Sequence, residues 1–281
     1  MSLQIEPQEQ KILDSVNIPP RPKALLTVME ESKKSEPSFA VIAKAIVADV
    51  SISATVLQIV NSPAFRRAAT IASIDQALSL LGLKRVISIV NAVSVKSATQ
   101  SNVDMESFWD NATVIANACV IVANNLKLRA LVDDVYTLGL FHNAGVPIMA
   151  SKFPDYMDFF QMAHEEGWAF NIVKEKEKYQ TTHTTIGALM AQSWTLPDEL
   201  VNVIYNLHYA DGIFLSDDLC ESSKKQLAIL KMAREIGRFY GGETESSAEW
   251  LEVEGQIIQF LELPSDQFEV IKEEVIASLE A

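Results

Sequence analysis

The sequence predicts an all-α protein, and three observations lead to this fold class. Apolar residues recur at the three- and four-residue spacing of a buried helix face, and residues that cap helices precede these runs. No run alternates apolar and polar residues for long enough to predict a sheet. Hydrophobic residues make up 48% of the 281 residues, with only 10 Gly and 10 Pro, as in a globular helical chain. We expect two packed helical lobes.

The first helices are short and have recognisable boundaries. Residues 18–22, Ile-Pro-Pro-Arg-Pro, are expected to be extended, because proline removes a backbone donor and disfavours helical geometry in the preceding residue. A helix begins where this segment ends. Ser38 is the expected N-cap of a second helix, which Asp49 closes. Ser51 or Ser53 is expected to cap the third.

The next boundaries are a stop and a capping box. Residues 61–63, Asn-Ser-Pro, stop the third helix, since all three residue types favour turns. Ser73 followed three residues later by Gln76 predicts a capping box, and Gly82 ends that helix.

Two longer apolar helices, from about residue 84 to 98 and from about 104 to 126, are predicted to form the centre of the molecule. The polar stretch between them places the lobe boundary near residues 100–106. We divide the chain into a helical N-terminal extension, a main module whose second lobe is a helical bundle, and C-terminal helices that pack on that bundle. These parts span residues 1–17, 18–215 and 216–281.

The charge of the chain argues against nucleic acid as a partner. Lys and Arg total 23 against 37 Asp and Glu, a formal charge of −14, whereas phosphate backbones are bound mainly by cations. Residues 38–48 and 51–60 can mimic a helix-turn-helix, but the second segment contains no Lys or Arg. A DNA-binding regulator is therefore the third choice of function.

The sequence predicts a cytoplasmic protein without membrane insertion. Its N-terminus lacks the charged and apolar segments of a secretory signal, and its most apolar stretches are shorter than a membrane span. Cys119 and Cys220 are far apart and are expected to be free thiols. Trp109 and Trp194 are expected to anchor the core.

Several motifs occur in an order and spacing that resemble the HDOD family, the HD-related output domains. The similarity covers roughly residues 18–215. It is carried by residues 18–22 (IPPRP), 60–65 (VNSPAF), 73–82 (SIDQALSLLG), 108–109 (FW), 138–145 (LGLFHNAG), 194–197 (WTLP) and 208–209 (HY). The resemblance implies an HD-like helical bundle in the second lobe.

The resemblance also implies which residues of this chain match the metal ligands of the parent HD phosphohydrolases. The matching positions are Asn111, His142, Asn143 and, by a looser placement, Arg234. An amide is a poor metal ligand compared with a carboxylate, and a guanidinium repels a cation. We therefore expect a degenerate site with no catalytic residue, metal or cofactor, as the family resemblance itself implies.

Three of the four histidines, His142, His183 and His208, fall on motif positions and are expected to converge. They form a candidate ligand or anion pocket, and burial is expected to lower their pKa values. The alternative is that they are inherited side chains, hydrogen-bonded within a helix cluster. His164 is expected to be an ordinary surface residue.

Asn61, Ser62, Arg66 and Arg67 form a candidate interaction loop. The alternative is structural, because Asn and Ser suit a helix stop and a charge pair is commonly solvated.

The resemblance favours a non-catalytic output module of bacterial-type signal transduction, acting through protein–protein interaction. It implies a signalling partner, with a sensor or a cyclic-dinucleotide enzyme as candidates. The alternative is a residual metal-dependent phosphohydrolase or phosphodiesterase that uses His142, His183 and His208.

Overall fold

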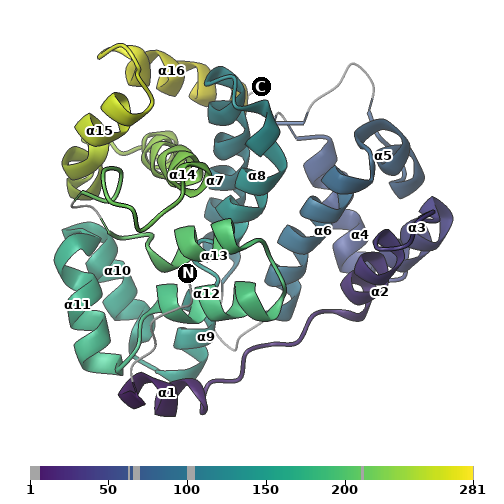
Figure 1. The fold of residues 1–281 in the computed structure, drawn as a ribbon, viewed down its shortest axis with the longest axis horizontal. Coiled ribbons are helices and arrows are strands. Elements are labelled where there is room, and N and C mark those ends of the chain that lie inside the picture. Colours follow the sequence, from purple (N-terminus) through teal and green to yellow (C-terminus); the bar gives the residue numbers. More distant parts are fainter. Residues whose placement is uncertain (1–6, 63, 66–69, 100–104, 210–211, 281) are drawn as a thin grey trace.

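The computed structural model describes residues 7–62, 64–65, 70–99, 105–209 and 212–280. These residues form helices and no strand, which confirms the predicted fold class (Figure 1). The helices are α1 (Pro7–Leu13), α2 (Lys23–Ser32), α3 (Phe39–Val47), α4 (Val50–Val60), α5 (Ile74–Leu81), α6 (Leu83–Ala98), α7 (Glu106–Asn125), the short 3₁₀ helix η1 (Arg129–Leu131), α8 (Val132–Phe141), α9 (Gly145–Lys152), α10 (Tyr156–Glu166), α11 (Trp168–Tyr179), α12 (His183–Ser193), α13 (Asp198–Tyr205), α14 (Glu221–Tyr240), α15 (Ala248–Phe260) and α16 (Gln267–Glu280).

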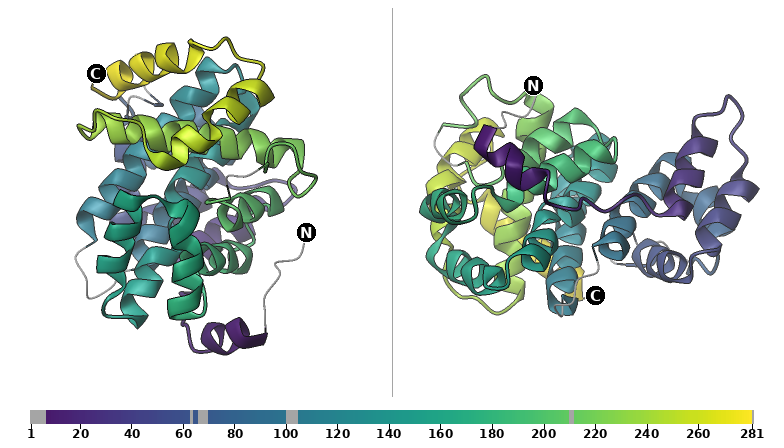
Figure 2. Two further views of the ribbon diagram at one scale, coloured as in Figure 1. Left: turned by 90° about the vertical axis from the view of Figure 1, so that its left-hand side faces the viewer. Right: turned by 90° about the horizontal axis from the view of Figure 1, so that it is seen from below.

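The helices form two groups that meet along α6 and α8 (Figures 1 and 2). In the smaller group α2 packs on α3, and α4 packs on α6. The larger group surrounds α7, which contacts α8, α14 and α16. Residues 100–104 lie outside the described residues, so a lobe boundary near 100–106 stays a prediction.

The helix starts of the smaller group follow from local capping. Ser38 accepts from the Val41 N–H at 3.4 Å, and Ser73 accepts from the Gln76 N–H at 3.2 Å, as predicted. The cap of α4 was assigned wrongly to Ser51 or Ser53. Asp49 is the N-cap instead: its backbone is extended and its carboxylate accepts from the Ile52 N–H at 3.0 Å.

The extended segment between α1 and α2 binds the turn after α12. Arg21 donates to Thr195 Oγ1 at 2.8 Å and to the Ser193 carbonyl at 3.1 Å. Trp194 Nε1 donates to the Pro19 carbonyl at 3.0 Å. Two motifs that are about 175 residues apart in sequence are thus in direct contact, which places the prolines and the tryptophan in one structural unit.

The core contains the residues expected there. Trp109 and Trp194 are buried, and Cys119 is a buried and Cys220 an exposed free thiol. Within the described ranges no single helix is long and apolar enough to cross a bilayer. The pair α3 and α4 passes that test together by length and composition, but it is bent by 112°.

That bend falls within the range of a helix-turn-helix. The exposed positions of α4, however, are Val50, Ser51, Ala54 and Gln58, and no cation lies among them. The geometry therefore adds no support for DNA binding.

Candidate functional site

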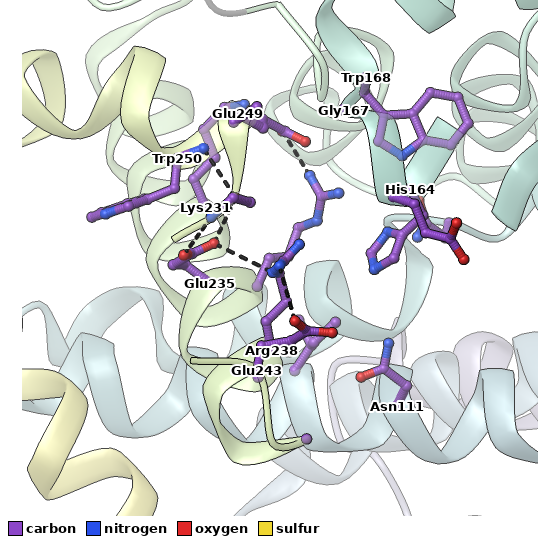
Figure 3. A pocket seen from close by; sticks show the side chains of 18 of the residues that line it. Asn111, His164, Gly167, Trp168, Lys231, Glu235, Arg238, Glu243, Glu249 and Trp250 are labelled. Atoms are coloured by element: carbon purple, nitrogen blue, oxygen red, sulfur yellow. Dashed lines mark hydrogen bonds and ion pairs between the residues drawn. The ribbon is translucent and has the colours of Figure 1, made fainter. Parts of the chain in front are cut away.

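A cavity of about 650 Å³ lies between α7, α10, α14 and the start of α15; we call it the central cavity (Figure 3). Glu249 and Lys231 lie on one side of it, His164 and Trp168 face them from the other, and Asn111 lies at its base (Figure 3). The cavity is therefore enclosed by helices from both the motif region and the C-terminal region.

All four positions that match the HD metal ligands line the central cavity: Asn111 from α7, His142 and Asn143 from the end of α8, and Arg234 from α14. Close packing holds the end of α8 in place, because α8 lies along α7 and α9 along α12. The structure thus places Arg234 in the same cavity as the other three residues.

These residues do not fit a divalent metal. Asn111 and Asn143 offer neutral amides, and the Arg234 guanidinium donates to Glu249 Oε1 at 2.8 Å. Lys231 donates to the same oxygen at 2.9 Å, so the one carboxylate close to Arg234 is already held by two cations. Among the residues that the structure describes, no three His, Cys, Asp or Glu side chains are grouped to hold a metal.

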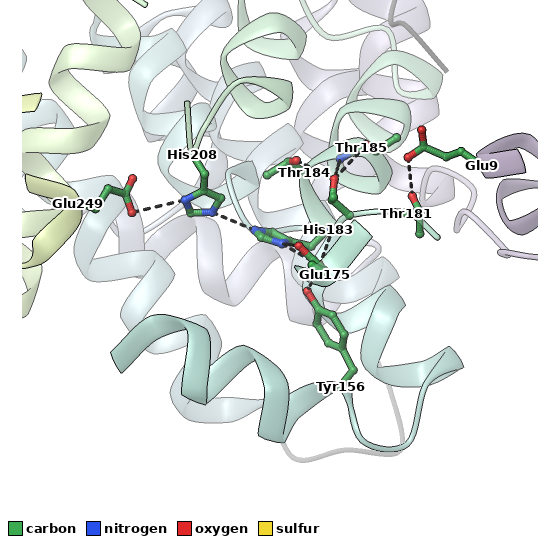
Figure 4. A network of polar contacts seen from close by, with 10 residues as sticks. Glu9, Tyr156, Glu175, Thr181, His183, Thr184, Thr185, His208 and Glu249 are labelled. Carbon is green, nitrogen blue, oxygen red and sulfur yellow. Dashed lines mark hydrogen bonds and ion pairs between the residues drawn. The ribbon is translucent and has the colours of Figure 1, made fainter. Parts of the chain in front are cut away.

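A buried chain of polar side chains connects α10 with the wall of the central cavity (Figure 4). Tyr156 Oη donates to Glu175 at 2.5 Å, and Glu175 also contacts His183 Nδ1 at 2.9 Å. His183 Nε2 lies 3.2 Å from His208 Nε2, and His208 Nδ1 lies 3.4 Å from Glu249 Oε2. The chain therefore ends on the carboxylate that binds Lys231 and Arg234.

The short contact between the two rings limits how they share protons. His183 Nε2 and His208 Nε2 lie 3.2 Å apart, so one of these atoms donates to the other and both cannot carry a hydrogen at the same time. Burial in addition lowers the pKa of His208 well below its usual value.

The structure brings the three motif histidines into one region but gives them different environments. His183 and His208 lie behind Trp168, whose ring stacks on His208 with centroids 4.6 Å apart. Only His142 lines the central cavity. Its Nδ1 lies 2.6 Å from the Gly139 carbonyl and must donate to it, which leaves Nε2 as an acceptor.

His142 remains neutral in the folded protein to low pH. Burial and the nearby Arg234 lower its pKa to about 3. In the unfolded chain the same ring takes up a proton near pH 6.5, so His142 removes stability as pH falls below that value, at about 1.4 kcal/mol per pH unit.

Urea unfolding between about pH 7 and pH 5 tests this linkage. The wild type should lose about 2 kcal/mol more free energy of unfolding than the His142→Gln variant over that interval. The pKa of His164 is also lowered, by burial and then by Arg234, so His164→Gln should remove a smaller part of the wild-type pH dependence than His142→Gln does. Parallel slopes for wild type and His142→Gln would refute the assignment.

The polar residues of the candidate interaction loop make structural contacts. Asn61 donates to the carbonyls of Leu57 and Ile71, both at 2.8 Å, and accepts from the Ile71 N–H at 2.8 Å. Ser62 donates to Asn117 at 3.2 Å. Asn61 thus ties the end of α4 to the segment before α5. Arg66 and Arg67 lie outside the described residues.

Several residues of the site were missed from the sequence. His164 was expected to be an ordinary surface residue, but it lines the central cavity, where burial and then Arg234 lower its pKa. Lys231 and Glu249 lie in the C-terminal helices, beyond the motifs, and no local pattern points to them. Glu175 stands in the charged run 174–178, which resembles a solvated helix face. Its burial is signalled by the spacing of the buried residues Trp168, Asn171, Glu175 and Tyr179 along α11.

The architecture is that of HD-like helical proteins. A candidate phosphohydrolase from Shewanella amazonensis SB2B superposes with a TM-score of 0.68 at 22% identity, covering 97% of this chain and 98% of that one. A candidate signal transduction protein from Marinobacter aquaeolei VT8 superposes with a TM-score of 0.63 at 18% identity, covering 100% of this chain and 68% of that one. At these sequence identities the structural similarity establishes the fold alone.

The family follows from the sequence itself. The family model of the HDOD domain matches residues 18–210, well over half of the chain, and the chain belongs to the HDOD family. An uncharacterized protein of Treponema pallidum (strain Nichols) is 24% identical over 275 residues, covering 95% of this chain and 51% of that protein. The chain therefore spans about half the length of this curated relative.

Proposed function

We propose that this chain is a non-catalytic regulatory module of signal transduction that acts through protein–protein interaction in the cytoplasm. Membership of the HDOD family fits a regulatory role, as does the signalling name of the Marinobacter protein with the same fold. The partner class is a signalling protein, with a sensor or a cyclic-dinucleotide enzyme as candidates.

One observation carries the non-catalytic part of the proposal. At the position matched to the last metal-binding carboxylate, Arg234 extends a guanidinium that is paired with Glu249. A divalent cation placed beside Arg234 and Lys231 would be repelled by both, and the amides of Asn111 and Asn143 supply no charge to offset this repulsion. Without a metal, no water is activated for attack on a phosphate ester.

The experiment pairs an activity assay with partner capture, using the full chain. Hydrolysis of bis(4-nitrophenyl) phosphate is measured with added Mn²⁺, Fe²⁺ or Zn²⁺, and cross-linked partners are identified by mass spectrometry from the native host. We expect no metal-dependent turnover and a signalling protein among the cross-linked partners. Turnover that is abolished in the His142→Ala variant would show that the residual phosphohydrolase is the correct function.

A further inference from the structure

We propose that the central cavity binds a small organic oxyanion that also carries hydrogen-bond donors, and that this ligand is the signal the module senses. The proposal rests on the regulatory function above, because it assigns an input to that module. Unpaired polar atoms, cationic side chains and an apolar wall in the lining of the cavity support this ligand class.

Three residues that line the central cavity each have a buried polar atom without a hydrogen-bond partner within the protein: His142 Nε2, Asn143 Oδ1 and Arg238 Nε. Folded proteins pair nearly all such atoms, because an unpaired buried polar group costs stability. His142 is only 1% exposed, so this imidazole cannot satisfy its free nitrogen by turning to bulk solvent. Three such atoms on one cavity indicate a site built for a polar ligand.

The chemistry of two of these atoms requires a donor on the ligand. His142 Nδ1 donates to the Gly139 carbonyl at 2.6 Å, so the Nε2 atom presents a lone pair. Asn143 Oδ1 is likewise an acceptor. Two donor groups on the ligand, each a hydroxyl or an N–H, would pair with these two acceptors.

The third atom, Arg238 Nε, and the nearby cations of Lys231 and Arg234 favour an anionic ligand. Lys231 and Arg234 share the single carboxylate of Glu249, at 2.9 and 2.8 Å, which leaves one positive charge in excess among these three side chains. Arg238 is only loosely paired, 3.9 Å from Glu235 and 3.7 Å from Glu243.

Glu235 is held elsewhere, since its two oxygens accept from the N–H and the hydroxyl of Ser247 at 2.9 and 2.6 Å. The Nε–H of Arg238 therefore remains available for an oxyanion. A charge-assisted hydrogen bond to a phosphate or carboxylate oxygen suits it.

The other residues that line the cavity determine which ligand shape and charge it accepts. Phe108, Met157 and Phe160 line the cavity and are partly buried, and its volume of about 650 Å³ is in the range of small-molecule sites. A ligand with an apolar or aromatic body fits this wall. Glu165, Glu243 and Glu245 also line the cavity and are exposed, so solvent screens them, and they disfavour a polyanion.

Isothermal titration calorimetry with four probes tests the proposal. Adenosine 5′-monophosphate combines a phosphate with several hydrogen-bond donors, and 4-hydroxyphenylacetate combines a carboxylate with one hydroxyl donor. Adenosine lacks the anion, and inorganic phosphate lacks the body. We expect at least one of the first two probes to bind, and adenosine and inorganic phosphate to bind about tenfold more weakly or not at all.

Two variants at partly buried positions separate the contributions. Arg238→Gln and Asn143→Leu should each weaken the binding of that probe by about tenfold. Arg129→Gln, an exposed arginine outside the cavity, is the matched control and should bind as the wild type does. Circular dichroism spectra that match the wild type establish that each variant is folded.

Two results overturn the proposal: neither anionic probe binds the wild type at millimolar concentration, or binding is unchanged in both cavity variants. Recovery of intact adenosine 5′-monophosphate after binding agrees with a sensing site. Conversion to adenosine would instead overturn the non-catalytic function while leaving the binding site in place, so the two failures are distinguishable.

Discussion

Replacing Glu249 with Gln is expected to lower the free energy of unfolding by about 3–5 kcal/mol. Glu249 holds two cations, Lys231 and Arg234, whose side chains are 2% and 13% exposed. It also faces His208 Nδ1. Removing its charge leaves the Lys231 ammonium buried without a counterion, and desolvation of that ammonium is then uncompensated. Urea unfolding of wild type and variant at neutral pH measures the loss.

A control and a rescue test the reason for this loss. Glu252→Gln changes an exposed carboxylate on the same helix and should alter stability by less than about 0.5 kcal/mol. Adding Lys231→Met to Glu249→Gln removes the unpaired charge, so the double variant should be more stable than Glu249→Gln alone. A loss below about 1 kcal/mol for Glu249→Gln would contradict the buried pairing.

Gly145→Ala is expected to lower the free energy of unfolding by at least about 3 kcal/mol. A Cβ atom at this position would lie 2.0 Å from the His183 carbonyl oxygen and 2.9 Å from the Gly187 nitrogen. Both are backbone atoms of α12, so no side-chain rotation relieves the overlap, and α9 has to move away from α12. That movement also displaces the segment 142–143 that lines the cavity.

The comparison for this substitution is Gly255→Ala in α15. A Cβ atom there meets nothing within 4 Å, so alanine should be neutral or should stabilise the helix by up to about 1 kcal/mol. Chemical denaturation of both variants checks the pair. If Gly145→Ala were as stable as the wild type, α9 and α12 would not approach as closely as described.

Much of the fold could be predicted because its signals are local. The caps at Ser38 and Ser73 depend on residues within one turn of the helix start, so a single sequence contains the needed information. The error at Asp49 has the same local origin: an Asp between two helices can end one or begin the next, and only the backbone conformation decides.

The candidate site could be predicted only in part. Asn111, His142 and Asn143 were located through family motifs, and the structure places all three on the central cavity. Lys231 on α14 and Glu249 on α15 form an ion pair between two helices, so the residues adjacent to each in sequence do not predict its role. The unpaired state of His142 Nε2 likewise depends on three-dimensional packing, which no residue pattern reveals.

The metal content of the 281-residue chain after incubation with Mn²⁺ and gel filtration tests directly whether the degenerate site holds a metal. Asn111, Asn143 and Arg234 are the residues that the family resemblance matches to the HD metal ligands; they line one cavity, and Arg234 pairs with Glu249 there. Elemental analysis should find no stoichiometric metal ion in the wild type. A stoichiometric ion that is lost in the His142→Ala variant would contradict the account.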